Sequence, residues 1–197
     1  ALHPRPKAAR FYGEFDKIPA KVTLCLFSPG GAHGEGFDFA MSNIKELPKY
    51  TRIAKNMGID MKITMKTQLE MHIDLASPKL KRKASTDVSF KIYTNERVAA
   101  EDFKAGQCDG VAISNLRARA FNNFVGSLDS IGAIESYAQM SEAIRLLAKP
   151  EAAKYMVNKD YEIVAMIPLG AAYIMVNDRK INSLAKAAGK KVAVIDF

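Results

Sequence analysis

One short apolar run restricts the fold more than any other part of the sequence. Residues 20–31, AKVTLCLFSPGG, hold a nearly continuous apolar stretch that is closed by Pro29, Gly30 and Gly31. Apolar residues at consecutive positions over so short a length are typical of a strand buried on both faces, and such strands occur mainly in sheets covered by helices. We therefore expect an internal strand that leads into a glycine-rich loop.

Helical and strand patterns alternate along the rest of the chain. Helix patterns cover residues 46–60, 94–106, 137–149, 150–157 and 181–189. Strand patterns cover residues 87–93, 109–114, 161–178 and 190–197. Thr94 is expected to cap the second helix and Gly106 to end it, while residues 115–130 are expected to form a loop. This alternation predicts the α/β class, with a mainly parallel sheet flanked by helices.

The segment from Met61 to Leu75 departs from this scheme. Its odd-numbered positions are apolar except for Thr67, and its even-numbered positions are polar. A period of two sustained over this length predicts a long half-exposed strand or a hairpin. Residues 61–92 are therefore expected to be an unusually β-rich part of the domain.

The chain is basic, and its cations are clustered. The formal net charge is +8, and the densest basic stretch is KLKRKAS, residues 79–85. No aromatic residues are interleaved with it, and no zinc-finger or RNP-type pattern surrounds it. We interpret the charge as solvated basic faces that also attract an anionic ligand, so no nucleic-acid partner is expected. A basic interaction module that uses Lys79 to Lys83 on nucleic acid is an alternative.

Metal and nucleophilic chemistry have little support in the residue pattern. The sequence has two cysteines, Cys25 and Cys108, and three histidines, none at metal-ligand spacing. A nucleophilic Cys108 would need a base and an oxyanion site, and no cysteine-protease signature surrounds it. We expect no metal, no cofactor and no enzymatic activity. A small hydrolase that uses the GGAHGEG loop around His33 is the alternative.

Candidate ligand-binding residues gather where predicted strands end. Arg117 and Arg119 follow the strand pattern of residues 109–114, and open α/β sheets bind ligands at the carboxyl ends of their strands. Arginine offers paired donors to a carboxylate or a phosphate. The two arginines could instead be a solvated pair or partners of Asp129 and Glu135. The predicted ligand-binding residues are Ser28, Gly30, Gly31, Glu35, Ser114, Asn115, Arg117, Arg119 and Tyr173.

About two-thirds of the chain resembles a known class of proteins. The segments that carry the likeness are LCLFSPGGAHGEGFDFA, the stretch from FKIYTNERVAAEDFKAGQCDGVAISNLRARAF to SIGAI, and YEIVAMIPLGAAYIMVNDRKINSLAKAAGKKVAVIDF. They are similar to the solute-binding proteins of tripartite ATP-independent periplasmic (TRAP) transporters, and more closely to a group of proteobacterial solute-binding proteins related to them. Residues 44–87 are longer than this class has at that point, and VAVIDF lacks its carboxylate-clamping arginine.

The resemblance implies a periplasmic-binding-protein-like fold and a transport function. Residues 1–160 would form the first α/β lobe, and residues 161–197 the crossing strand and the start of a second lobe that is largely truncated. The protein would be a periplasmic receptor that captures a small, anionic solute for a membrane transporter. Ala1 is compatible with a removed signal peptide and equally with a trimmed chain.

Within such a sheet, the two cysteines would lie close to each other. Cys25 belongs to the first predicted strand, and Cys108 lies where the chain enters the parallel neighbour of that strand. This placement allows either a disulfide or simple packing. Export into an oxidising compartment would favour the disulfide.

Overall fold

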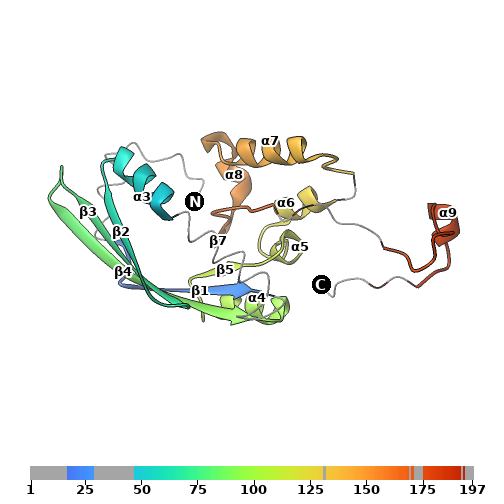
Figure 1. Ribbon diagram of the computed structural model, residues 1–197, viewed down its shortest axis with the longest axis horizontal. Helices are drawn as coiled ribbons and strands as arrows, with labels where there is room; N and C mark the ends of the chain where they lie inside the picture. Colours follow the sequence, from blue (N-terminus) through green and yellow to red (C-terminus); the bar gives the residue numbers. More distant parts are fainter. Residues whose placement is uncertain are drawn as a thin grey trace.

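A five-stranded sheet organises the chain (Figure 1). The structure is a computed structural model that describes residues 17–28, 47–130, 132–168, 170, 175–191 and 193. In spatial order the strands are β2 (Asp60–Thr67), β3 (Glu70–Ser77), β4 (Arg82–Tyr93), β1 (Lys21–Phe27) and β5 (Gly110–Ala112).

The sheet is mixed rather than mainly parallel. β1 pairs in parallel with both β4 and β5, as predicted for the buried apolar run and its neighbour. β2, β3 and β4 pair antiparallel, so the alternating segment forms the predicted hairpin and β4 extends it. The α/β class is confirmed, and the antiparallel half follows from the period-two pattern, which buries only one face of each strand.

Helix α3 (Leu47–Asn56) covers one face at the β2 end of the sheet. The register places Met61, Leu75 and Ala84 in one row across three strands, and this row packs against a small core of Ala54 and Ile59. Alternate residues on the same strands point to the opposite face, which is mostly polar and partly to fully exposed. The helix predicted within residues 46–60 is confirmed, and Gly58, with a φ of 77°, lies just after its end.

Helix α4 (Glu96–Lys104) packs against the parallel part of the sheet, with contacts to β1, β4 and β5. Ala99 and Ala100 are buried on its inner side. The predicted cap at Thr94 is wrong by one residue, because the Asn95 side chain accepts hydrogen bonds from the first turn. Gly106 has the positive φ of 77° that was predicted for the end of this helix.

Residues 115–130 were predicted to be a loop, and most of them are helical. Two four-residue helices, α5 (Asn115–Ala118) and α6 (Asn123–Gly126), are followed by a 3-10 turn, η3 (Ser127–Asp129). The prediction failed because Ser114 and Asn122 each cap a helix that is too short to show an apolar period. Ala118 and Val125 from these helices form a second core with Met156.

The next segment returns to this second core. α7 (Tyr137–Leu147) lies within the helix predicted for residues 137–149. It is followed by η4 (Pro150–Ala152), α8 (Ala153–Met156), β6 (Val157–Asn158) and β7 (Tyr161–Glu162). The side-chain amide of Asn122 donates to the Tyr155 carbonyl at 2.8 Å, and that of Asn158 donates to the Phe121 carbonyl at 2.7 Å. These two bonds attach α8 and β6 to the connection between α5 and α6.

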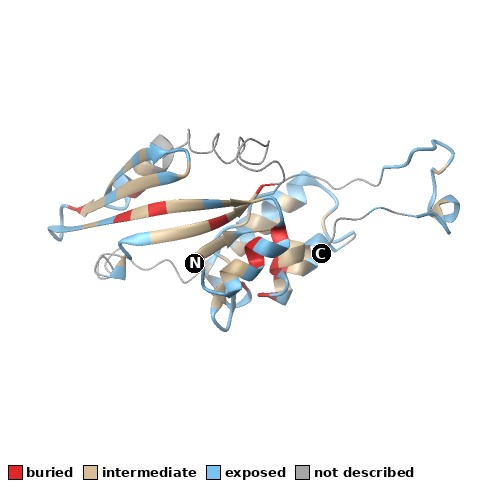
Figure 2. Cartoon of the chain, turned by 90° about the horizontal axis from the view of Figure 1, so that it is seen from below, coloured by how far each residue is buried: buried red, intermediate tan, exposed pale blue. Residues whose placement is uncertain are grey.

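Among the described residues of the strand predicted for 161–178, only Tyr161 and Glu162 of β7 are in a strand. Residues 163–168 have no regular structure, and no strand among the described residues pairs with them, so the backbone ladder that defines a strand is not formed. Helix α9 (Leu184–Ala187) is present as predicted but lies apart from the sheet (Figure 1). Residues 175–191, which include α9, are largely exposed (Figure 2), with Met175 at 88% and Leu184 at 87%. Most of the strand predicted for residues 190–197 lies outside the described residues.

Candidate functional site

The carboxyl ends of the three parallel strands meet at one edge of the sheet. Ser28 follows β1, Tyr93 ends β4, and Ser114 lies two residues after β5. The backbone N–H of Ser28 donates to the Tyr93 carbonyl at 2.8 Å, and Ser28 is only 2% exposed. Two of the predicted binding residues, Ser28 and Ser114, therefore lie at the edge where α/β sheets place ligands.

A buried carboxylate organises this edge. Glu96, in the first turn of α4, is 8% exposed. Its carboxylate accepts hydrogen bonds from both the backbone N–H and the hydroxyl of Ser114, the latter at 3.1 Å. The Ser114 hydroxyl in turn accepts from the Arg117 N–H at 3.3 Å and so caps α5. Glu96 was not among the predicted site residues, and its role as the acceptor for Ser114 was missed.

Arg117 completes the cluster. Its Nε lies 3.9 Å from Oε2 of Glu96, and its side chain is 16% exposed. Withdrawing both charges from water is costly, and their mutual attraction offsets part of that cost only because they face each other. Ser114, Glu96 and Arg117 therefore form one polar unit, which we call the edge cluster.

The structure separates the other predicted residues of this loop from the edge cluster. Arg119 is exposed, and its side-chain stem lies against Gly126, where an added Cβ would stand 3.0 Å from the Arg119 Cβ. Asn115 donates a hydrogen bond to Asp129; burial raises the pKa of the Asp129 carboxyl, and the bond from Asn115 partly opposes that rise. The contacts described for Asn115 and Arg119 thus lie outside the edge cluster, and their part in ligand binding stays a prediction.

Four predicted binding residues lie outside the described residues. They are Gly30, Gly31, Glu35 and Tyr173, and His33 of the alternative hydrolase site lies outside them as well. Their part in the site stays a prediction.

The two cysteines form a disulfide behind this edge. Cys25 and Cys108 are bonded, with their Cα atoms 5.9 Å apart, and both are buried. The Tyr93 hydroxyl lies 3.3 Å from the Cys25 sulfur and donates to Asp102 Oδ2 at 2.7 Å. Burial, followed by the bond to Asp102, raises the pKa of Tyr93 to about 12. Cys108 is thus a structural residue rather than a nucleophile.

Asp109, next to Cys108, also has a structural role. Its backbone N–H donates to the Thr23 carbonyl at 2.8 Å, and its carboxylate accepts from the Thr23 N–H at 2.7 Å. These bonds fix the entry of β5 beside β1. The residue that follows, Gly110, lies so close to β1 that a Cβ there would stand 2.8 Å from Leu24 Cδ2.

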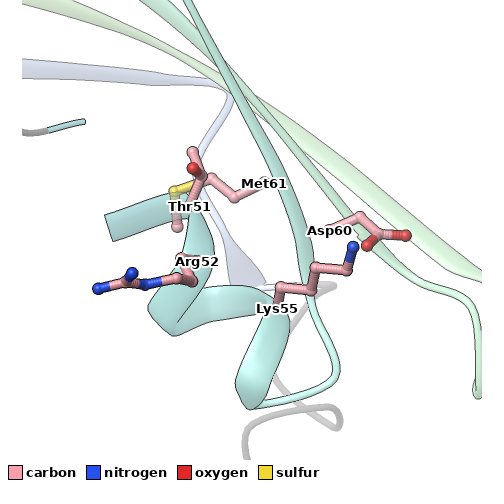
Figure 3. Close-up of a pocket in the computed structure, with 5 residues that line it drawn as sticks. All are labelled: Thr51, Arg52, Lys55, Asp60 and Met61. Atoms are coloured by element: carbon pink, nitrogen blue, oxygen red, sulfur yellow. The ribbon is translucent and has the colours of Figure 1, made fainter. Parts of the chain in front are cut away.

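An open hollow of about 310 Å³ lies between α3 and β2, at the opposite end of the sheet (Figure 3). Its lining consists of Thr51, Arg52, Lys55, Asp60 and Met61. Asp60 begins β2, and the register carries that row across Ala76 to Lys83 near the start of β4. The hollow is therefore remote from the carboxyl ends of the parallel strands and shares nothing with the edge cluster.

Within the described ranges, no three His, Cys, Asp or Glu side chains come together in a group that could hold a metal ion. In the same part of the chain, none of the helices has the length and apolar character that crossing a bilayer requires.

Comparison with known proteins places the chain among solute-binding proteins. The family model described as solute-binding protein AdeT 1/2 matches residues 7–197, and the chain belongs to that family. It is 53% identical over 111 residues to "Probable solute-binding protein AdeT1" of Acinetobacter baumannii, over 56% of this chain and 36% of that protein. It is 35% identical over 71 residues to "Probable solute-binding protein AdeT2" of the same organism, over 36% of this chain and 30% of that protein.

The matched segments span about a third of the length of these curated relatives. No solved structure matches the chain. The family thus supports the predicted solute-binding class, while the fold rests on the architecture described above.

Proposed function

We propose that the protein is a non-catalytic receptor that captures a small solute outside the cytoplasm, in the periplasm, and delivers it to a membrane transporter. Membership of a solute-binding protein family supports the first part of this proposal. The observation that carries the location of the site is the edge cluster, where Glu96, Ser114 and Arg117 meet at the carboxyl edge of parallel strands. This is where a ligand of an α/β sheet is expected.

The solute that fits the edge cluster is anionic. Glu96 uses its oxygens to accept from Ser114 and faces the Nε side of Arg117, so it orients the guanidinium. A guanidinium can bind a carboxylate in bidentate fashion, and Arg117 is the group of the cluster that would contact such a solute. Because Glu96 offsets one positive charge, the cluster recognises an anion by directed hydrogen bonds more than by net charge.

Residues 1–160 would form one lobe, and residues 161–197 would cross to a second. In support, the segment after β7 exposes large apolar side chains that a single-lobed protein would bury, among them Val164 at 68% and Ile167 at 65%. Solute contacts made on both lobes would favour the closed state, which is how ligand binding drives closure. The proposal includes a relation to the binding proteins of TRAP transporters.

A thermal-shift comparison tests the proposed site. The wild-type chain, Arg117→Gln and Arg119→Gln would each be titrated with short-chain carboxylates and, separately, with uncharged sugars. Ligands that bind the native state raise the melting temperature according to their affinity. We expect at least one carboxylate to stabilise the wild type and Arg119→Gln but not Arg117→Gln. Equal stabilisation of both variants, or stabilisation by sugars alone, would contradict an anion site at Arg117.

A further inference from the structure

The turn between β3 and β4 forms the far end of the sheet. Figure 1 shows the β3–β4 hairpin projecting at the left, on the opposite side of the molecule from α5 and α6. We call residues 78–83 the basic tip; all of them are exposed. The turn is fixed by a hydrogen bond from the Lys81 N–H to the Pro78 carbonyl at 3.4 Å and by one from the Leu80 N–H to the Ser77 hydroxyl at 3.4 Å. Ser77, at 1% exposure, anchors the turn.

The basic tip concentrates positive charge in a stretch of the sequence that has no acidic residues. It contains Lys79, Lys81, Arg82 and Lys83, and the chain has no acidic residue between Asp74 and Asp87. Asp74 lies opposite Ser85 and accepts from His72, and Asp87 accepts from Lys66 and His72. The two flanking carboxylates are thus engaged further down the hairpin, and Lys79, Lys81 and Lys83 are exposed at the tip.

Two further features separate this tip from an ordinary solvated turn. Leu80, a large apolar residue at the apex, is 43% exposed between lysines. Lys81 has a φ of 52°, a left-handed conformation in which glycine is more stable than lysine. The turn therefore carries a cation at a position where the backbone alone would favour glycine.

We propose that the basic tip is a docking surface for anionic lipid headgroups. Clustered Lys and Arg side chains beside an exposed apolar residue match the interface of an anionic bilayer, where cations pair with phosphates and an apolar side chain enters the headgroup region. Nucleic acid fits less well, because the tip has no aromatic side chain for stacking and Leu80 contributes nothing to phosphate contacts. The surface lies away from the edge cluster and does not depend on the solute.

Co-sedimentation with lipid vesicles tests the docking surface. The probes are vesicles of equal parts phosphatidylglycerol and phosphatidylcholine, with phosphatidylcholine alone as the uncharged reference. Each cation near an anionic surface strengthens binding about five-fold, so the double variant Lys79→Gln/Lys83→Gln should bind the anionic vesicles roughly 25-fold more weakly. Lys104→Gln/Lys149→Gln removes the same net charge from exposed positions in and after the helices, so it should bind as the wild type does. Equal losses in the two double variants would overturn the proposal, because net charge would then explain the binding.

Lys81→Gly separates docking from folding. It removes one cation and relieves the left-handed strain, so its urea midpoint should be at least that of the wild type while its affinity for the anionic vesicles falls about five-fold. If the folded Lys81→Gly protein bound the anionic vesicles with unchanged affinity, the basic tip would not be the lipid-docking surface.

Leu80→Ser distinguishes a lipid surface from nucleic acid. On anionic vesicles, the loss of the apolar side chain should weaken binding several-fold, whereas binding to duplex DNA of random sequence should be weak in both proteins. Tight, salt-sensitive DNA binding that ignores Leu80→Ser, together with vesicle binding that also ignores it, would overturn the lipid proposal in favour of a nucleic-acid surface.

Discussion

Glu96 and Ser114 are eighteen residues apart in the chain, yet the carboxylate of Glu96 accepts both hydrogen-bond donors of Ser114. Glu96 begins α4, and Ser114 lies two residues after β5, so the contact joins the start of the helix to the end of the strand that follows it. Arg117 is held by the same pair: its backbone N–H donates to the Ser114 hydroxyl, and its guanidinium Nε lies 3.9 Å from Glu96 Oε2. The position of the candidate anion-binding group therefore depends on one buried carboxylate.

Replacing Glu96 tests this dependence. Glu96→Gln puts an amide NH₂ group where the carboxylate accepts from Ser114, and it leaves the Arg117 charge without its buried counter-ion. Leaving buried donors unsatisfied costs about 1–3 kcal/mol, so we expect the free energy of unfolding to fall by about 2 kcal/mol. Urea unfolding followed by circular dichroism measures the change.

The matched control is Glu101→Gln on the same helix. Glu101 pairs with Arg97 at 2.9 Å, but both side chains are more than half exposed. Exposed pairs of this kind contribute about 0.5 kcal/mol or less. If Glu96→Gln costs no more than Glu101→Gln, Glu96 does not organise the edge.

The disulfide should dominate the response of the protein to reduction. Cys25 and Cys108 are separated by 83 positions, and the chain-entropy estimate for a loop of this size is about 4 kcal/mol. We expect a reductant to lower the urea midpoint of the wild type strongly. Cys25→Ala/Cys108→Ala should unfold at a similarly low midpoint and show no response to the reductant. Superimposable wild-type curves with and without reductant would show that the bridge does not stabilise the chain.

Patterns local in sequence predicted much of the fold. The period of two between Met61 and Leu75 became the β2–β3 hairpin, and the apolar run of residues 20–31 became β1. The predictions that failed have one physical cause. They concern segments whose secondary structure depends on contacts with residues distant in the sequence. The helices at residues 115–126 are capped by Ser114 and Asn122 and packed on Met156, and residues 163–168 pair with no described strand.

The candidate site shows the same division. Its place at the carboxyl ends of the strands was predictable, because β5 and the residues after it could be read from the sequence. The separation of Arg117 from Arg119 was not, because it depends on α5, where residues two positions apart point to different sides. The sequence shows Glu96 as an acidic residue one position after an Asn that can cap a helix. The residues around it in the sequence do not indicate that it accepts hydrogen bonds from Ser114.

Tyr93 should give the protein a stability loss at alkaline pH. Burial and the bond to Asp102 raise its pKa from 10.0 to about 12, so the folded state favours the neutral phenol. The resulting stabilisation is fully present below pH 10 and is lost as the pH rises through 12. Thermal unfolding of the wild type and of Tyr93→Phe across this range measures it. The gap between the two proteins should narrow with rising pH, and a constant gap would contradict the raised pKa.

His72 should titrate above the ordinary range of a histidine. On the polar face of the sheet, its Nδ1 lies 2.7 Å from Asp87 and its Nε2 lies 3.1 Å from Asp74. Hydrogen bonds to Asp87 first and to Asp74 second raise the pKa of His72 above 6.5. Because the folded state favours the protonated ring, the stabilisation is complete below pH 6.5 and is lost as the pH rises through the folded pKa.

Nuclear magnetic resonance titration of the His72 ring, compared between two single variants, tests the order of these causes. Asp87→Asn should lower the pKa of His72 more than Asp74→Asn, since the bond to Asp87 is the shorter and makes the larger contribution. Asp87 is also held by Lys66 at 2.6 Å, and the bonds from Lys66 and His72 lower the pKa of the Asp87 carboxyl. Asp87 therefore stays ionised as His72 titrates. A larger effect from Asp74→Asn would mean that the ring is turned toward Asp74 in solution.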